Sequence, residues 1–238
     1  MAHRKQGYRF KNDWTEEKLR AGREGEGGWK IVKPVPVNIK IEVEHRVLNL
    51  EKAGEYLDKA HSFVVLNCGC RTARGNCDAP RDVCLAIDDA AEKALTDDAY
   101  KDLNPRKTTK EEAMQVLARS HEAGLVHMAL DVMGENRVNA ICSCCSCCCA
   151  ILSSVVRFGL FPQLLKSDAI SVTDMSACTS CGVCVERCQF GAREMTGDKL
   201  TINDRLCMGC GLCVTKCPTA AIKLVAKSNE DARKNWRH

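Results

Sequence analysis

The chain has 238 residues, of which 18 are cysteine, 45% are apolar and only 5% are aromatic. The apolar fraction supports folded cores and excludes disorder of the whole chain, and the length allows one large or two small domains. The formal charge of +4 is concentrated at the start, because residues 1–40 hold ten Lys and Arg against five Asp and Glu.

The N-terminus does not resemble a secretory signal, because Met1–Phe10 is basic and polar and no apolar segment follows before Ile31. The longest uncharged stretch, Val138–Val156, approaches the length of a membrane span, but Cys, Ser, Ala and Asn fill much of it and make a poor lipid-facing surface. We therefore expect a cytoplasmic protein without a membrane span, whose cysteines stay reduced.

Residues 1–40 are predicted to form a basic arm and linker. They contain the Gly-rich segment Gly22–Gly28 and the extended piece Pro34–Pro36, neither of which suits a core element. A basic arm can favour nucleic acid or an acidic protein surface. We expect it instead to dock on its own protein or on a sister subunit.

A cysteine-rich module is predicted over residues 41–165. Apolar residues recur at helical spacing in Leu50–Ala60, and Phe63–Leu66 is typical of a strand that leads to Cys68. Asp88–Leu95 predicts a short helix.

A longer helix is predicted to begin at Thr109, which forms a capping-box pattern with Glu112. It is expected to run to about Glu122, with Gly124 as its stop. The following segment, Leu125–Met133, leads towards a run of six cysteines.

A helix over Ala150–Leu160 is expected to leave this run and to close the module. Asp168 opens a new unit, which is predicted to span residues 168–226. The polar residues 227–238 are expected to form a tail.

The second unit contains a repeat of 29 residues in which four cysteines coincide between the two copies. Gly182 with Gly211 and Ala192 with Ala221 coincide as well, which cysteine spacing alone does not require. Each copy has the spacing C-x2-C-x2-C-x3-C, and Pro218 follows the last cysteine of the second copy. The cysteines are Cys178, Cys181, Cys184 and Cys188 in the first copy and Cys207, Cys210, Cys213 and Cys217 in the second.

This repeat resembles the bacterial two-cluster ferredoxins. The resemblance implies two 4Fe-4S clusters with crossed ligands, since the fourth cysteine of each copy binds the cluster of the other copy. Gln189 departs from the pattern, because the first copy usually has proline there. The implied ligand sets are Cys178, Cys181, Cys184 and Cys217 for one cluster, and Cys207, Cys210, Cys213 and Cys188 for the other.

Structural zinc and disulfides are the alternatives for these eight cysteines. Zinc sites use two separated pairs rather than a triple run with a fourth cysteine, and disulfides suit an oxidising compartment. We therefore predict an α+β protein in which a cysteine-rich N-terminal α/β module precedes a dicluster ferredoxin-like domain.

Ten cysteines remain in the N-terminal module. Their arrangement, from roughly Ile41 to Phe161, resembles a poorly characterised family of bacterial and archaeal 4Fe-4S binding proteins, in which a cysteine-rich module precedes a dicluster ferredoxin domain. The resemblance implies no chemistry beyond iron-sulfur binding. The ten are Cys68, Cys70, Cys77, Cys84, Cys142, Cys144, Cys145, Cys147, Cys148 and Cys149.

Ten thiols can complete two cubanes with two left over, one larger cluster, or one cubane with redox-active spares. The six in the run cannot all bind one cube, because adjacent side chains diverge. Alternate side chains can converge, so Cys142, Cys144 and one of Cys147–Cys149 are expected to face one way and the others another. Zinc and bare thiols remain alternatives to at least one additional iron-sulfur cluster.

Three further side chains near these cysteines are candidates for a functional role. His127 leads towards the cysteine run and is a candidate cluster ligand or proton donor, although structural roles for His121 and His127 are the alternative. Arg71 could donate hydrogen bonds to cluster sulfur, or else lie on the surface as a solvated cation.

No Walker A run, no G-x-G-x-x-G after a strand, no radical-SAM triad and no CCG motif of the heterodisulfide-reductase type occurs in the sequence. Without a nucleotide or flavin site, the chain is expected to pass electrons rather than to perform a substrate reaction. We expect single electrons to move through the two C-terminal clusters, to or from at least one further cluster in the N-terminal module. A partner oxidoreductase, such as a flavoprotein, would exchange those electrons with the protein.

Two alternatives belong to other classes. The N-terminal cluster could be an open-site catalyst that the ferredoxin domain supplies with electrons, or the chain could be a redox- or metal-sensing regulator. We do not expect nucleic acid as a partner, because bound clusters add negative charge and bring the formal +4 close to neutrality. Both homo- and hetero-oligomers are compatible with the sequence.

Overall fold

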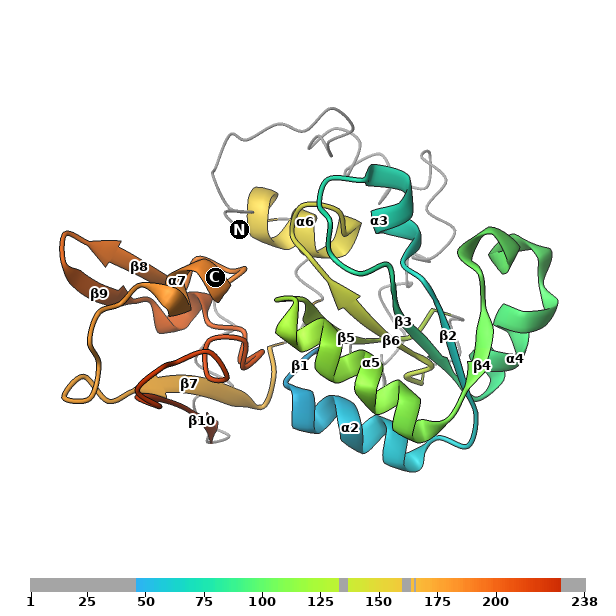
Figure 1. Cartoon of the computed structure of the whole chain (residues 1–238), viewed down its shortest axis with the longest axis horizontal. Helices are drawn as coiled ribbons and strands as arrows, with labels where there is room; N and C mark the ends of the chain where they lie inside the picture. Colours follow the sequence, from blue (N-terminus) through green and yellow to red (C-terminus); the bar gives the residue numbers. More distant parts are fainter. Residues whose placement is uncertain (1–45, 133–136, 160–163, 165, 228–238) are drawn as a thin grey trace, which may run out of the picture.

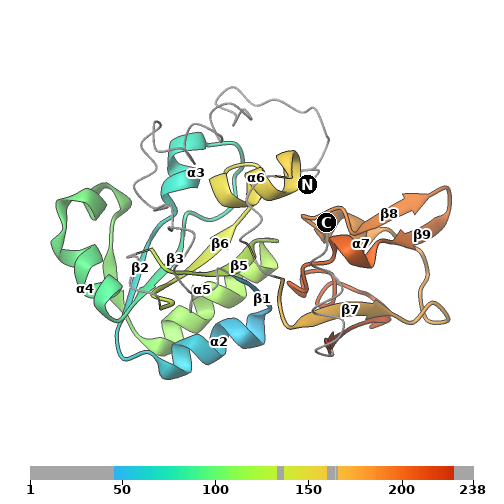
Figure 2. The same cartoon turned by 180° about the vertical axis from the view of Figure 1, so that it is seen from behind.

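The computed structural model describes residues 46–132, 137–159, 164 and 166–227. The expected arm and all but the first residue of the expected tail lie outside this part. The described residues form a mixed helix and sheet structure, which confirms that part of the predicted fold class. The strands up to Cys144 form one large sheet, and helices up to Phe158 pack on it. The later elements form a smaller body beside it (Figure 1 and, from behind, Figure 2).

One six-stranded sheet organises residues 46–144, and every neighbouring pair in it is antiparallel. Its spatial order is β1-β5-β6-β3-β2-β4. The strands are β1 (Arg46–Leu48), β2 (Phe63–Asn67), β3 (Asp82–Ile87), β4 (Arg106–Thr108), β5 (Val126–Leu130) and β6 (Ala140–Cys144).

Helices cover both faces of this sheet. Helices α2 (Leu50–Lys59) and α5 (Lys110–Glu122) pack against one face through an aliphatic core that includes Leu57 and Leu117. On the other face, α4 (Asp89–Thr96) packs on β2 and β3 through small alanines, followed by the 3-10 turn η1 (Asp98–Leu103).

Two further helices begin at cysteines on this second face. Cys68 is the N-cap of α3 (Gly69–Arg74), and Cys149 is the N-cap of α6 (Ala150–Phe158). Both helices lie together above the sheet in Figure 1. Within the described residues, no helix is both long and apolar enough to cross a membrane.

The helices predicted from periodicity are confirmed to within a few residues. Thr109 caps α5 and accepts a hydrogen bond from the backbone N–H of Glu112 at 3.2 Å, as the capping-box pattern indicates. Gly124 lies just after the helix with a φ of +82°, a conformation that glycine adopts without strain. The sequence did not predict strand β5, because all five of its residues are buried and show no polar alternation.

The second body is built from two small antiparallel sheets. Strand β7 (Ala169–Thr173) pairs with β10 (Ile222–Ala226), so that the two ends of the repeat lie together. Strand β8 (Arg193–Thr196) pairs with β9 (Lys199–Ile202). Helix α7 (Val183–Arg187) and the 3-10 turn η2 (Asp204–Leu206) complete the body.

Candidate metal centres

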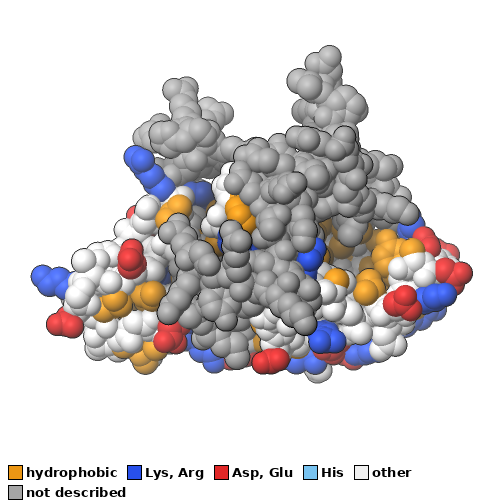
Figure 3. All heavy atoms as spheres, turned by 90° about the horizontal axis from the view of Figure 1, so that it is seen from above, with side chains coloured by type: hydrophobic (Ala, Val, Ile, Leu, Met, Phe, Trp, Pro, Cys, Tyr) orange, Lys and Arg blue, Asp and Glu red, His pale blue; other side chains and the backbone are white. Residues whose placement is uncertain are grey.

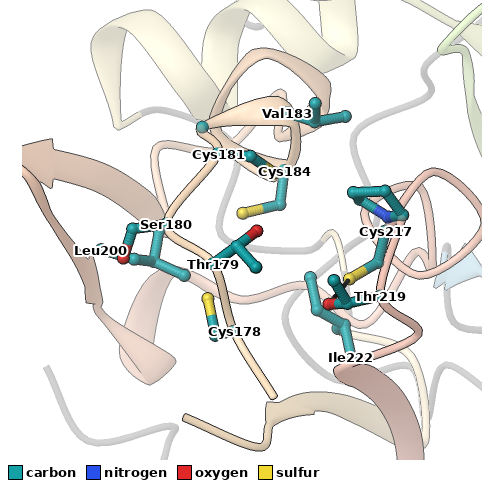
Figure 4. Close-up of a pocket in the computed structure, with 12 residues that line it drawn as sticks. Cys178, Thr179, Ser180, Cys181, Val183, Cys184, Leu200, Cys217, Thr219 and Ile222 are labelled. Atoms are coloured by element: carbon teal, nitrogen blue, oxygen red, sulfur yellow. Dashed lines mark hydrogen bonds between the residues drawn. The ribbon is translucent and has the colours of Figure 1, made fainter. Parts of the chain in front are cut away.

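The first centre in the second body is a pocket lined by cysteines of both repeat copies. Cys178 and Cys181 lie in the loop that enters α7, Cys184 lies in the first turn of that helix, and Cys217 comes from the second copy of the repeat. Figure 4 shows Cys217 facing the three across the pocket. The pocket contains about 320 Å³ of atom-free space, part of it open to solvent.

The second pocket has the reciprocal composition. Cys207, Cys210 and Cys213 come from the second copy and Cys188 from the first, around a similar volume of about 320 Å³. Four thiols around an open space fit the ligand set of a 4Fe-4S cluster. The two pockets thus group the cysteines into the same sets that the ferredoxin resemblance implies.

The two pockets differ in their access to solvent. Cys181 of the first pocket is exposed, and Cys178 and Cys217 are half-buried. All four cysteines of the second pocket are buried, and burial raises the pKa of Cys210 above its ordinary value. The first pocket therefore faces the surface and the second faces the interior.

A buried arginine lies between these pockets. Arg193, only 2% exposed, donates hydrogen bonds to Thr173 Oγ1 at 3.0 Å and Ser171 Oγ at 3.1 Å. Its Nη1 also lies 3.8 Å from the Sγ of Cys184. Burial opposes the charge, but Cys213 of the second pocket and Cys184 of the first raise the pKa of Arg193. One permanent cation is thus shared by both candidate clusters.

Six of the N-terminal thiols form one group on the sheet face that α3 and α6 cover. Cys84 on β3 faces the same side as Cys142 and Cys144 on β6, because Leu85 pairs with Ile141 and side chains alternate along each strand. The remaining members come from the starts of α3 and α6. Each thiol of the group shifts the pKa of the next one, in the order Cys68, Cys84, Cys142, Cys144, Cys149 and Cys70.

The thiols of this group shift one another's pKa values in opposite directions. Cys144 lowers the pKa of Cys142 to about 6 and holds that of Cys149 well below its usual range. Cys142 in turn raises the pKa of Cys144. Cys149 also accepts a hydrogen bond from the backbone N–H of Leu152 at 3.5 Å, in the first turn of α6. Cys142 and Cys149 are thereby favoured as thiolates, the form that binds metal, whereas the pKa values of the other four thiols, Cys68, Cys70, Cys84 and Cys144, are raised.

The other four N-terminal thiols form a separate group. The Sγ atoms of Cys77, Cys145, Cys147 and Cys148 all lie within 4.8 Å of one another. This division agrees with the expectation that Cys142, Cys144 and one later cysteine face away from the rest of the run. The later cysteine is Cys149.

Arg71 lies between the two N-terminal groups and is completely buried. Its Nη2 donates to the Sγ of Cys145 at 3.4 Å and to the carbonyl of Ser143 at 3.2 Å. Burial alone would lower its pKa, but Cys145 and then Cys68 raise it. The expected donation to sulfur is therefore present between arginine and thiol, and the alternative of a solvated surface cation is wrong.

His127 is buried, and its Nδ1 lies 3.0 Å from the Oγ of Ser143. Its ring stacks on His121, with centroids 5.8 Å apart and planes inclined by 17°. Burial lowers the pKa of His127 to about 3, so the ring is neutral near pH 7. Among the described residues, neither histidine joins a group of three or more potential metal ligands, and ligation by His127 stays a prediction.

The two bodies meet at the residue that follows a pocket cysteine. The amide oxygen of Gln189 accepts hydrogen bonds from the N–H of Ser146 at 3.1 Å and from its hydroxyl at 2.7 Å. The amide nitrogen donates to the carbonyl of Gly124 at 2.9 Å. Gln189 thereby joins Cys188 of the second pocket to the cysteine run, which the proline usual at this position could not do.

Arg187 adds a second contact between the bodies. Its guanidinium donates to the carbonyls of His121 at 2.6 Å and Glu122 at 2.9 Å, at the C-terminal end of α5. A cation at this end of a helix is favourable, because the last carbonyls carry partial negative charge. The hydroxyl of Thr215 also lies 3.1 Å from Nε2 of His121.

Residues 177–222 match the family model of the 4Fe-4S dicluster domain. The chain therefore carries a ferredoxin-like 4Fe-4S domain over about a fifth of its length. The match does not reach the N-terminal module, whose resemblance to a family of 4Fe-4S binding proteins stays a prediction. The search of curated proteins found no match.

Sequence reasoning missed Arg193 and underestimated Gln189. The repeat held a signal for both, because Arg193 aligns with the apolar Ile222 and Gln189 with Pro218. An arginine aligned with a buried apolar residue indicates a buried charge with a partner. No local pattern indicated Ser146, whose contact with Gln189 depends on the packing of the two bodies.

Double variants test the crossed ligand sets by counting iron. Cys217→Ala alone should lose about four irons, and adding Cys178→Ala should cost no more, because both would bind one cluster. Cys217→Ala with Cys207→Ala should instead lose about eight irons. Iron and acid-labile sulfide are measured on anaerobically purified protein, and the reverse pattern would show that each copy binds its own cluster.

Arg193 should raise the reduction potential of both C-terminal clusters. Replacing it by methionine removes a buried positive charge beside two anionic sites, so both potentials should fall, whereas Arg193→Lys should show a smaller decrease. EPR-monitored redox titration measures both variants. A shift confined to one cluster would contradict the shared position of the guanidinium.

Gln189 should hold the two bodies together without binding metal. Gln189→Leu leaves the N–H and hydroxyl of Ser146 without their partner, and is expected to cost about 2 kcal/mol or more. Gln189→Glu keeps the acceptor and should cost less. The midpoint of anaerobic urea denaturation measures the change, and an unchanged midpoint for the leucine variant would contradict this role. Both variants should retain the iron content of the original protein.

Proposed function

We propose that this chain is an electron-transfer protein that carries single electrons between a partner oxidoreductase and a metal centre in its N-terminal module. When bound, 4Fe-4S clusters supply one-electron oxidation and reduction. The dicluster family match supports iron-sulfur chemistry at the C-terminal end. The route and its partner are inferences from the arrangement of the cysteines.

The packing between the second pocket and the six-thiol group carries the proposal. Met208, Cys210 and Leu212 of the second pocket belong to the same apolar cluster as Cys144 and Cys149 of the six-thiol group. Only side chains in mutual contact lie between these two sets of thiols. Short separations of this kind favour transfer of an electron without a diffusing carrier.

The solvent exposure of the three groups of cysteines supports a direction for the electron route. The first pocket has the exposed Cys181 at its rim, the second is buried, and no cysteine of the six-thiol group is exposed, since three are buried and three are half-buried. A partner would therefore dock near Cys181, and the electron would move inward. A flavoprotein is one class of partner with suitable one-electron chemistry.

The surface supports a protein partner more than a nucleic acid. On the face shown in Figure 3, the charged side chains of the described residues include both signs, interspersed around the rim. Nucleic-acid binding needs a continuous basic field, since its affinity comes largely from phosphate contacts. We therefore propose a protein as the partner of this chain, and the six-thiol group as the site that receives its electrons.

Reductive titration of the whole protein tests the proposal. Each ferredoxin cluster accepts one electron, so a third centre in the N-terminal module should raise the uptake above two electrons per chain. Cys84→Ser, in the six-thiol group, should bring the uptake back to about two. The control Ser154→Ala, whose hydroxyl bonds only to the carbonyl of Ile151 in α6, should behave as the original protein.

Uptake of only two electrons by the original protein would overturn the proposed route and leave the chain a simple ferredoxin. Spectral changes of the third centre on adding a small substrate would instead indicate an open-site catalyst.

A further inference from the structure

The group Cys77, Cys145, Cys147 and Cys148 differs in geometry from the cluster pockets. Sγ of Cys77 lies 3.7 Å from that of Cys145 and 3.8 Å from that of Cys148. The sulfurs of Cys147 and Cys148 are also 3.8 Å apart. These thiols touch one another, with no room for a cluster core between them.

The separations correspond to the edges of a small tetrahedron. A zinc–thiolate bond is about 2.3 Å long, so four thiolates around one zinc lie about 3.8 Å apart. A 4Fe-4S cube places four irons and four sulfides between its ligands, and it holds the cysteine sulfurs much farther apart. The contacts therefore fit one metal ion rather than a cube.

The same chain provides an internal comparison. Both ferredoxin quartets line pockets that open partly to solvent, rather than packing sulfur against sulfur. Among the described residues, the Cys77 group is the one set of three or more potential ligands whose atoms all lie within 4.8 Å of one another. Sites suited to clusters and a site suited to a single ion thus take different forms in one structure.

The surroundings also support a charged metal site. Four thiolates around a divalent ion leave a net charge of about −2, and the buried Arg71 donates to the sulfur of Cys145 at 3.4 Å. Asn76 donates to the carbonyl of Cys147 at 2.9 Å, which holds the Cys77 loop against the cysteine run.

We propose that Cys77, Cys145, Cys147 and Cys148 bind a single zinc ion in a tetrahedral all-thiolate site. Zinc is favoured over ferrous iron at a site of this kind by the usual order of divalent affinities. All four positions are filled by protein ligands, so the site is structural rather than catalytic. It is independent of the proposed electron route, because zinc exchanges no electrons.

This zinc would fix the turn that faces the second body. Three ligands come from the turn between β6 and α6, and Cys77 comes from the loop between α3 and β3. Ser146, which binds Gln189, lies between two of the ligands. The ion would therefore hold in place both the contact with the ferredoxin-like body and the neighbouring Cys144 and Cys149.

Metal analysis of the full-length protein, purified anaerobically, tests the proposal. The original protein should contain about one zinc per chain, bound to four sulfurs at about 2.3 Å by X-ray absorption at the zinc edge. Cys77→Ser should lower zinc occupancy several-fold and leave the irons of the two ferredoxin-like pockets in place. The matched variant Cys84→Ser, also half-buried but in the six-thiol group, should retain zinc and lose iron.

Loss of about four irons from Cys77→Ser, without zinc in the original protein, would overturn the proposal and indicate a cubane at this group. Zinc bound through nitrogen or oxygen ligands would overturn it as well. If Cys77→Ser does not fold, X-ray absorption on the original protein still decides the outcome. Failure of the electron route would appear in the reductive titration and leave the zinc result unaffected.

Discussion

The fold buries many cysteine side chains, whose negative charge in a metal-bound form would need compensation. Each body places one arginine between two groups of cysteines: Arg71 among the N-terminal thiols and Arg193 between the ferredoxin-like pockets. Both guanidinium groups are almost completely buried, which is costly unless partners of opposite charge surround them. Since arginine stays protonated whatever its surroundings, each supplies a fixed positive charge to two groups of cysteines at once.

The boundary between the bodies follows from a departure from the ferredoxin pattern. Proline at position 189 would end the cysteine motif without a side-chain contact, whereas Gln189 reaches Ser146 and Gly124. Arg187, two residues earlier, binds the C-terminal end of α5. These contacts come from residues that flank Cys188, so the second pocket is built together with the interface. Of its cysteines, Cys210 packs in one apolar cluster with residues of the N-terminal body, while the first pocket has the exposed Cys181 at its rim.

Local signals in the sequence predicted much of this arrangement. The repeat and its resemblance to ferredoxins predicted how the eight C-terminal cysteines group. Helical periodicity located α2, α4, α5 and α6. Strand alternation predicted that Cys142 and Cys144 face the same side of the sheet. The strands of the large sheet were harder to predict, since β5 is buried on both faces and β6 contains small residues and two cysteines in place of most of the usual β-branched residues. Cys77 could not be grouped with Cys148 from sequence, because 71 residues separate them and only tertiary packing brings them together.

The six-cysteine run shows how one short segment can serve two kinds of metal site. Cys142 and Cys144 at its start and Cys149 at its end face the six-thiol group, and the three cysteines between Cys144 and Cys149 turn towards Cys77. A structural ion bound by the inner cysteines would restrict the backbone on which the outer three depend. The position of the proposed redox group would then be set by a metal that takes no part in electron transfer. The many cysteines of this turn would meet two different requirements, rigidity and redox chemistry.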